Sequence, residues 1–421
     1  MSRTANLRPG LTPCLKSSGL KMLLFWCELE YLLAMAVWSA VLIVALRSLL
    51  LWRRRLRGAA AEVAEGRKPS GQKRSAEKPV STVSGSWKLK LAFSVWSLLA
   101  LLTSLELGFA AFVDTTDAFN ATNVCHRWFR RHVDPYRNEA GFRDRREPQA
   151  GSRDDVRQIY FFGDSFTIAQ GVDRLEDRFT DRVEAELNLR RGSTGKEIQV
   201  ANFGEFGWDV SLIEGMVQAT LGQGYRPDVI VYVYMLNDIE GYDPRTEVAI
   251  KSIQQSRSTF WLWNRTYFFN WLHFCWQQYN AGRTVDYFPH LADSYNSPVW
   301  PNVRAALQRI KERCDAHGVE FRMAFFPFLH NLGREYPFKH AHKKLADFCE
   351  ESGVKYLDLE PVLSPHSGEG LMVNKFDNHP NERSHAIVAD AMVEQLLQDQ
   401  VKVPSVDRNP AAAQGREDTP E

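Results

Sequence analysis

Ile159-Tyr-Phe-Phe-Gly-Asp-Ser-Phe-Thr167 is the stretch on which the interpretation of this 421-residue chain depends. Residues 159–162 are aromatic or β-branched, which predicts a buried strand. The glycine that follows ends the strand, and a helical pattern begins near Thr167 or Ile168. Ser165 therefore stands where a strand passes into a helix, at the sheet edge where open α/β folds place their sites. A simpler interpretation is that Asp164 or Ser165 only caps the helix.

Downstream, strand patterns alternate with helix patterns. The predicted strands are 157–162, 197–203, 228–234, 319–326 and 354–358. The predicted helices are 173–190, 209–222, 301–317, 338–352 and 380–398, with Pro301 and Pro380 as first helical residues. Strands that alternate with helices predict a parallel sheet covered on both faces.

Two apolar segments precede this region. After a polar N-terminus (1–21), residues 22–52 contain an apolar run long enough to cross a bilayer, which needs roughly 20 residues. A second run occupies residues 89–113. A cleavable signal peptide is a poor alternative for the first run, because Arg53-Arg54-Arg55 follows it instead of a small-residue cleavage site. We therefore expect two transmembrane helices.

The segment between them, residues 53–88, is basic and rich in Ala, Ser, Gly and Pro, which predicts a disordered linker. The positive-inside rule assigns this linker to the cytoplasm. Everything after residue 113 would then be extracytoplasmic. Glu106, the only acid of the second run, invites either a functional or a structural explanation. Residues 401–421 are predicted to be a disordered tail.

Net charge and cysteine spacing bear on nucleic-acid binding, metal sites and disulfides. The formal net charge of +1 gives no reason to expect nucleic acid as a partner. The six cysteines show no C-x-x-C spacing, so we expect no metal site. One or two disulfides are possible among the four cysteines from residue 125 onward, without an assigned pairing.

Polar residues follow several predicted strands. Asn202 and Gly207 come after the second strand, and Asn237-Asp238 after the third. Asp377 and His379 precede the last helix. Each pattern alone is compatible with an ordinary turn or helix cap. Together, at the strand ends of one sheet that also presents a serine, they predict a site.

The residue types suit acyl transfer. Serine is a weak nucleophile that needs an adjacent base, which His379 can supply to Ser165. Asp377 can orient the imidazole and stabilise its charged form. The backbone N–H groups of Ser165 and Gly207 and the amide of Asn237 are candidate donors to the oxyanion of a tetrahedral intermediate.

These motifs resemble those of the SGNH (GDSL-type) hydrolases. Gly163-Asp164-Ser165, Gly207, Asn237-Asp238 and Asp377-Asn-His379 match the family's blocks, and Asn202 lies five residues before Gly207, as in its second block. The resemblance covers about residues 138–400 and implies a three-layer α/β/α sandwich with a flavodoxin-like five-stranded parallel sheet. It also implies that Ser165 is the nucleophile and His379 the base, with Asp164, Asn202 and Asp238 supporting the site.

Two departures from the family pattern stand out. Met235 replaces the usual glycine of the third block, and the last block is Asp-x-His rather than Asp-x-x-His. The Asn138-x-x-Gly-Phe-Arg143 stretch and Tyr336-Pro337 resemble a bacterial membrane-anchored branch. Residues 114–156 otherwise form a loop-like lead-in to the hydrolase domain at 157–400. The absence of a G-x-S-x-G elbow argues against an α/β-hydrolase.

An aromatic-rich insertion occupies residues 242–300. It could serve as a lid, an acyl-binding wall or a membrane-resting surface, or simply form a second hydrophobic cluster. His330 and Asn331 are also expected at the site end of the sheet, where they would contact substrate or close a loop.

The sequence thus predicts a membrane-anchored serine esterase or deacetylase, without a cofactor, whose domain is extracytoplasmic. Its partners would be the membrane and an ester-bearing small molecule, glycan or lipid. An O-acyltransferase of envelope glycans would use the same residues, and a non-catalytic glycan- or partner-binding relative is a third alternative.

Overall fold

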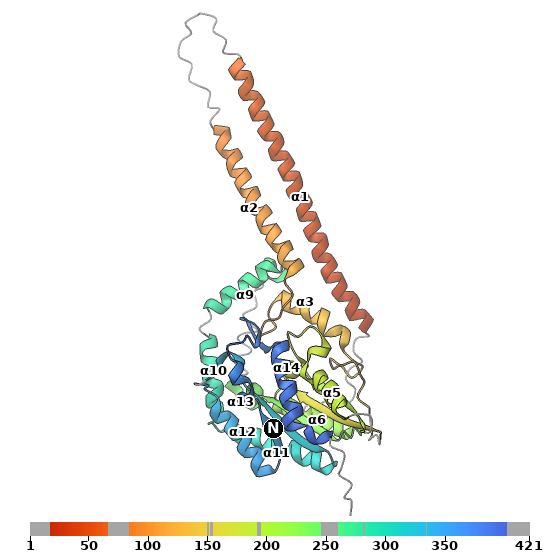
Figure 1. The fold of residues 1–421 in the computed structure, drawn as a ribbon. Coiled ribbons are helices and arrows are strands. Elements are labelled where there is room, and N and C mark those ends of the chain that lie inside the picture. Colours follow the sequence, from red (N-terminus) through yellow and green to blue (C-terminus); the bar gives the residue numbers. More distant parts are fainter. Residues whose placement is uncertain are drawn as a thin grey trace, which may run out of the picture. The chain divides into compact units, whose positions relative to one another are not determined.

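A computed structural model describes residues 17–65, 84–149, 151, 155–191, 195–245, 260–280, 283–333 and 335–401. The chain divides into two compact units. The first unit comprises the described residues up to Arg131 together with those of 253–284, and the second unit comprises the described residues of 132–252 and those from 285 onward. Figure 1 shows the elements of both units.

Two long helices, α1 (Ser17–Glu65) and α2 (Ser84–Phe112), pack side by side in the first unit (Figure 1). Their segments Leu29–Ala61 and Trp87–Phe112 are long and apolar enough to cross a membrane. Helix α1 continues through Glu65, so residues 53–65, predicted as part of a disordered linker, are helical. Residues 66–83 lie outside the described residues, as does the tail from 402 onward.

Among the described residues, three shorter helices also belong to the first unit. Helix α3 (Asn123–His132) buries Val124, Cys125 and Trp128, so the lead-in segment is not only a loop. Helices α8 (Trp261–Arg265) and α9 (Phe268–Asn280) come from the aromatic insertion. Helix α10 (Arg283–Ser294) belongs to the second unit from residue 285 onward. The insertion is therefore divided between the units, and its residues 246–259 lie outside the described residues.

The second unit is built on a five-stranded parallel sheet. Its order is β2-β1-β3-β4-β5, with bounds β1 Val156–Gly163, β2 Glu197–Gly204, β3 Val229–Met235, β4 Glu320–Phe326 and β5 Lys355–Asp358. This is the flavodoxin-like order of doubly wound folds. The five predicted strands are confirmed, each to within about one residue.

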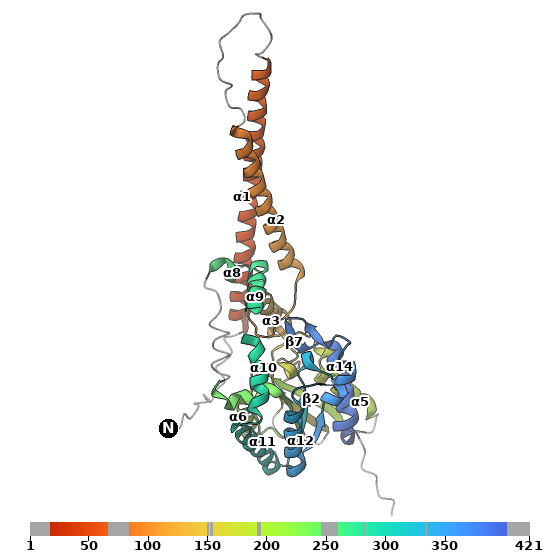
Figure 2. The same ribbon diagram turned by 90° about the vertical axis from the view of Figure 1, so that its left-hand side faces the viewer.

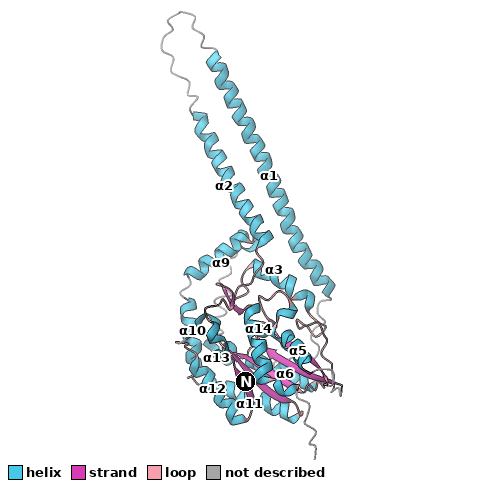
Figure 3. Ribbon diagram, in the orientation of Figure 1, coloured by secondary structure: helices cyan, strands magenta, loops and turns pink. Residues whose placement is uncertain are grey.

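Helices cover both faces of this sheet, as Figure 3 shows by their positions around the strands. Helix α6 (Val210–Gly222) packs with α11 (Val299–Ala316), and α5 (Phe179–Arg190) packs with α14 (Glu382–Ala391). Helix α12 (Lys339–Ser352) contacts β4 and β5. In Figure 2 the sheet, marked by β2, lies between α6 and α14. The predicted three-layer sandwich is confirmed.

Short elements connect these layers. They are η1 (Asp134–Tyr136), α4 (Ser165–Ile168), η2 (Leu175–Asp177), η3 (Leu236–Tyr242), η4 (Leu329–Asn331), α13 (Glu360–Leu363), η5 (Ser364–His366), η6 (Met392–Leu396) and η7 (Gln398–Gln400), and a hairpin of β6 (Met372–Asn374) and β7 (Asp377–Pro380). Pro301 is the third residue of α11 and Pro380 the last of β7, so neither begins a helix as predicted.

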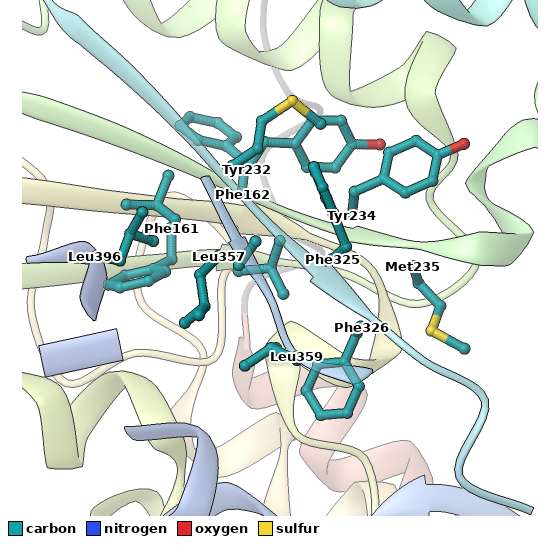
Figure 4. Packing of buried hydrophobic residues seen from close by; sticks show 14 of the residues in the cluster. Phe161, Phe162, Tyr232, Tyr234, Met235, Phe325, Phe326, Leu357, Leu359 and Leu396 are labelled. Atoms are coloured by element: carbon teal, nitrogen blue, oxygen red, sulfur yellow. The ribbon is translucent and has the colours of Figure 1, made fainter. Parts of the chain in front are cut away.

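Side chains of alternate strand residues fill the two faces of the sheet, as the pleat requires. All seven residues of β3 are buried, as expected of a central parallel strand. Phe161 packs toward the side of Leu396, whereas Tyr232 and Tyr234 point to the other side (Figure 4). Among the described residues, Cys125, Cys275, Cys314 and Cys349 are not joined to one another by a disulfide, in contrast to the pairing that the sequence left possible.

Candidate active site

Ser165 lies just beyond the carboxyl end of β1. Helix α4 begins at Ser165 itself, two residues before the predicted start, and lasts a single turn. The Asp164 side chain caps this turn, because its Oδ1 accepts a hydrogen bond from the Phe166 N–H at 2.9 Å. The capping interpretation therefore holds for Asp164. Its Oδ2 also lies 3.4 Å from Ser165 Oγ, but the serine hydroxyl has a closer partner.

That partner is His379. The distance from Ser165 Oγ to His379 Nε2 is 2.7 Å, although the residues are far apart in sequence. The other ring nitrogen, Nδ1, hydrogen-bonds Asp377 Oδ1. A carboxylate can only accept, so Nδ1 carries the proton and Nε2 is the atom that accepts from the serine hydroxyl.

The two-residue spacing of Asp377 and His379 follows from the strand that holds them. Side chains at positions i and i+2 of a strand point to the same side. Both residues belong to β7, and Asp377 Oδ1 also accepts from the backbone N–H of His379 at 3.1 Å. Residues 377–380 thus form a strand rather than an ordinary turn or helix cap, and α14 begins after it, capped by Asn381.

Buried neighbours hold the His379 imidazole and the Asp377 carboxylate in place. Asp377 is fully buried and His379 is only 7% exposed. Gln170 Nε2 lies 3.5 Å from Asp377 Oδ2, and the Phe166 ring packs 5.1 Å from the imidazole, centroid to centroid. These contacts restrict rotation of the ring, and the buried carboxylate would stabilise an imidazolium formed during reaction.

Two glycines let the serine turn approach the sheet. A Cβ on Gly204 would lie 2.3 Å from the backbone nitrogen of Ile168, and a Cβ on Gly163 would lie 2.9 Å from the carbonyl oxygen of Val233. Backbone atoms cannot move aside as a flexible side chain can. The carboxyl ends of β1 and β2 therefore need glycine for close packing rather than for unusual dihedral angles.

Gly207 and Asn237 follow β2 and β3, the two strands that flank β1 in the sheet. Gly207 has φ +64°, a left-handed conformation that favours glycine, and no heavy atom of another residue lies within 4 Å of the position that a Cβ would occupy. Asn237 Oδ1 is buried and has no hydrogen-bond partner among the described residues. A buried amide oxygen without a partner calls for an explanation, and a ligand that donates a hydrogen bond is one.

Asn202 supports the serine turn. Its Nδ2 donates to the Thr167 carbonyl at 2.7 Å and to Thr180 Oγ1 at 3.0 Å, and its Oδ1 accepts from the Gly204 N–H at 2.8 Å. These bonds tie β2 to α4 and leave the side chain committed to the fold. Asn202 is therefore a positioning residue, which holds the turn that carries Ser165.

Asp238 likewise stabilises the turn that follows β3. Its Oδ2 accepts from the Tyr232 hydroxyl at 2.7 Å and from the Met235 N–H at 3.2 Å. Burial raises the pKa of Asp238 well above its usual range, and burial also raises the pKa of Asp164 to about 6. Met235 has φ −95° and ψ 145°, so this turn does not require the glycine that the family pattern has there.

Arg143 is a residue of the site that the sequence did not reveal as such. Its fully buried guanidinium donates to the carbonyls of Ile168, Ala169, Val172 and Asp173, at 2.8–3.2 Å. These bonds fix the loop that follows α4, which includes Ala169 at φ +66° and Gln170 next to Asp377. The only signal was its place in the Asn138-x-x-Gly-Phe-Arg143 stretch.

His330 lies in an aromatic environment. Its ring packs 4.1 Å from Phe288 and 5.7 Å from Phe328, centroid to centroid, and Nε2 lies 2.8 Å from Asn331 Nδ2. Burial lowers the pKa of His330 to about 4. Because η4 contacts β7, the strand of His379, His330 lies near the site end of the sheet as expected.

No protein-family model and no curated protein matches this chain. Among solved structures, a member of the lipolytic G-D-S-L family from Veillonella parvula DSM 2008 is similar, with 14% identity, 57% of this chain and 98% of that chain covered, and a TM-score of 0.34. A catalytic mutant of an acetylxylan esterase from Geobacillus stearothermophilus shows 14% identity, 59% and 96% coverage and a TM-score of 0.37. TesA shows 12% identity, 58% and 99% coverage and a TM-score of 0.36. Similarities at this level carry no argument, so the function must rest on the chain's own geometry.

Proposed function

We propose that this protein is a membrane-anchored serine esterase of the SGNH (GDSL-type) kind, which hydrolyses ester bonds, chiefly O-acyl esters, through an acyl-enzyme. The observation that carries the proposal is the 2.7 Å hydrogen bond between Ser165 Oγ and His379 Nε2, with Asp377 bonded to the other ring nitrogen. A serine becomes a useful nucleophile at neutral pH when a base so placed can take its proton.

The reaction follows from this geometry. Ser165 Oγ attacks the ester carbonyl while His379 Nε2 takes the hydroxyl proton, and Asp377 stabilises the resulting imidazolium. The backbone N–H groups of Ser165 and Gly207 and the Asn237 amide donate to the oxyanion of the tetrahedral intermediate. His379 then returns the proton to the departing alcohol. Water, activated by the same histidine, attacks the acyl-enzyme, releases the acid and restores the Ser165 hydroxyl.

The setting of the reaction is inferred from the two apolar helices and the basic segment between them. Helices of this length can span a bilayer, and the positive-inside rule places the basic segment in the cytoplasm. The second unit is then extracytoplasmic, where O-acylated glycans and lipid esters would be its substrates. Free acid released without an added alcohol would identify water as the acceptor. Release of the leaving alcohol that depends on an added sugar, with the acyl group recovered as a sugar ester, would identify acyl transfer.

The proposal can be tested with the full-length chain purified in detergent and p-nitrophenyl acetate as the substrate. We expect Ser165→Ala to abolish turnover. Asp377→Asn should lower kcat by about 10³–10⁴-fold, because the amide favours the wrong histidine tautomer. Asp315→Asn is the matched control, since Asp315 is exposed and pairs only with Lys311 in the described contacts. Turnover by folded Ser165→Ala equal to that of the unaltered chain would contradict the proposal.

A further inference from the structure

Helix α9 of the first unit is unusual in composition. Its 13 residues, Phe268–Asn280, read F-F-N-W-L-H-F-C-W-Q-Q-Y-N and include no Asp, Glu, Lys or Arg. The polar residues that it does contain are Asn, Gln and His, and the others are aromatic, Leu or Cys. The residues of α9 that contact α2 and those that are exposed have different environments.

One side packs on the end of α2. The Phe109 ring of α2 lies 5.9 Å from the rings of both Phe268 and Trp271, centroid to centroid. Phe274, one turn further along, is 5% exposed and packs against Trp271. This side is a conventional helix contact.

Glu106 determines the position along the α2 axis at which α9 is bound. Its carboxylate accepts from the backbone N–H groups of Tyr267 and Phe268, at 2.7 and 2.8 Å, and from the Tyr31 hydroxyl at 2.8 Å. These N–H groups lie at the start of α9, where a helix has no internal acceptors. Glu106 is thus a cap supplied by another helix, and it lies six residues before the end of α2, about 9 Å along its axis.

A second contact strengthens this junction. The Arg127 guanidinium of α3 lies 4.4 Å from the centre of the Tyr267 ring and donates to the carbonyls of Ala110 and Val113, at the end of α2. Figure 1 shows α9 leaving the end of α2 crosswise rather than continuing along the α1–α2 pair. The position and direction of α9 are therefore set by the apolar helix pair.

Further along α9, beyond its contact with α2, large apolar side chains are exposed. Leu272, Trp276 and Tyr279 are 48%, 62% and 90% exposed. Their spacing of four and three residues places them on one helix face. Tryptophan and tyrosine at such positions are typical of the boundary between lipid and water.

We propose that α9 lies in the interfacial zone of the bilayer that α1 and α2 cross, with Leu272, Trp276 and Tyr279 inserted at the headgroup–acyl boundary. The inference rests on the membrane anchoring in the proposed function. A helix crosswise to a membrane-spanning helix, pinned about 9 Å from its end, runs in the membrane plane at that depth. Its lack of charge suits that zone, and the hydrogen bonds to Glu106 offset the cost of a carboxylate there.

The test uses the full chain in lipid bilayers with a nitroxide spin label at Tyr279→Cys. The chain has 12 tryptophans, so a single label is more specific than intrinsic fluorescence. The background carries Cys14→Ser, Cys27→Ser and Cys275→Ser and keeps the buried Cys125, Cys314 and Cys349. Leu98→Cys on α2 serves as the lipid control, and Leu189→Cys on α5, 76% exposed, as the water control.

Collision of the label with oxygen, which prefers lipid, is compared with collision with a water-soluble nickel chelate. We expect the oxygen-to-nickel ratio at residue 279 to be several-fold higher than at 189 and lower than at 98. A ratio equal to that at 189 would overturn the inference by showing α9 in water. Low accessibility to both reagents would also overturn it and indicate a protein partner or a second copy. A water-like ratio at 98 itself would refute the anchoring rather than only the position of α9.

Discussion

At the scale of single residues, two histidines six positions apart have opposite environments. His379 has the Asp377 carboxylate on one ring nitrogen and the serine hydroxyl on the other. His385 is fully buried, stacks on Phe179 and accepts the Phe179 N–H through Nδ1 at 3.1 Å. Burial, with Arg178 next in importance, lowers the pKa of His385 to about 3. One histidine is placed to gain a proton and the other to remain neutral.

The environment of His385 predicts a pH dependence of stability. The unfolded chain takes up a proton at this residue below about pH 6.5, whereas the folded chain does so only near pH 3. The free energy of unfolding should therefore fall as the pH decreases through this window, by about 3 kcal/mol between pH 7 and pH 4. His385→Asn keeps an acceptor for the Phe179 N–H and removes the titration, so its loss of stability over this range should be smaller.

Urea unfolding of the full chain at pH 7, 5.5 and 4 measures this difference. His317→Asn, at an exposed position after α11, is the matched control for the same substitution outside the core. An unchanged pH slope in His385→Asn would show that His385 does not titrate as its surroundings imply.

At the scale of elements, the sequence predicted the strands well because β1, β3 and β4 are apolar runs bounded by polar turns. Ser165 and Asn237 could be proposed for the site because they follow β1 and β3, at the sheet edge where such folds place their sites. The β6–β7 hairpin was missed, since its short polar strands have no apolar alternation and Pro380 suggested a helix start. The role of Arg143 was missed because its four acceptors belong to a loop about 25–30 residues away.

The close contact between β2 and α4 gives an element-scale prediction. Gly204→Ala should lower the free energy of unfolding by about 1–3 kcal/mol, because its Cβ would meet the backbone of Thr167 and Ile168. Esterase activity should fall with it, since the turn that carries Ser165 must shift. Gly215→Ala, within α6 and without a heavy atom within 4 Å of its Cβ, should instead raise stability by up to about 1 kcal/mol and keep full activity.

Thermal unfolding measures the stability of both variants, and p-nitrophenyl acetate turnover measures their esterase activity. If Gly204→Ala were as stable and as active as the unaltered chain, the close approach of strand and serine turn would not be a requirement of the site.

At the scale of the whole molecule, the chain combines a helical first unit with an α/β second unit that contains the Ser165–His379–Asp377 arrangement. The first unit includes part of the aromatic insertion, which sequence order alone assigned to the hydrolase domain. Glu106, ambiguous in the sequence, proves to be the cap of α9. Such a contact joins residues about 160 positions apart and has no local sequence signal.

The proposed topology predicts the location of reporters fused to the chain. Alkaline phosphatase, which is active only outside the cytoplasmic membrane, should be active when fused after residue 125 and inactive when fused near residue 70. A reporter that is active only in the cytoplasm should show the converse. The reversed pattern for both reporters would contradict an extracytoplasmic catalytic unit.

The most direct test of the central claim, an activated serine at residue 165, is covalent labelling of the full-length protein with a fluorophosphonate. Intact mass and peptide mapping would give the number and the position of adducts. We predict a single adduct on Ser165 that is absent in Ser165→Ala and lost in His379→Ala, since both variants remove one end of the hydrogen bond that activates the hydroxyl. No adduct on the folded, unaltered chain, or an adduct that persists in Ser165→Ala, would contradict the claim.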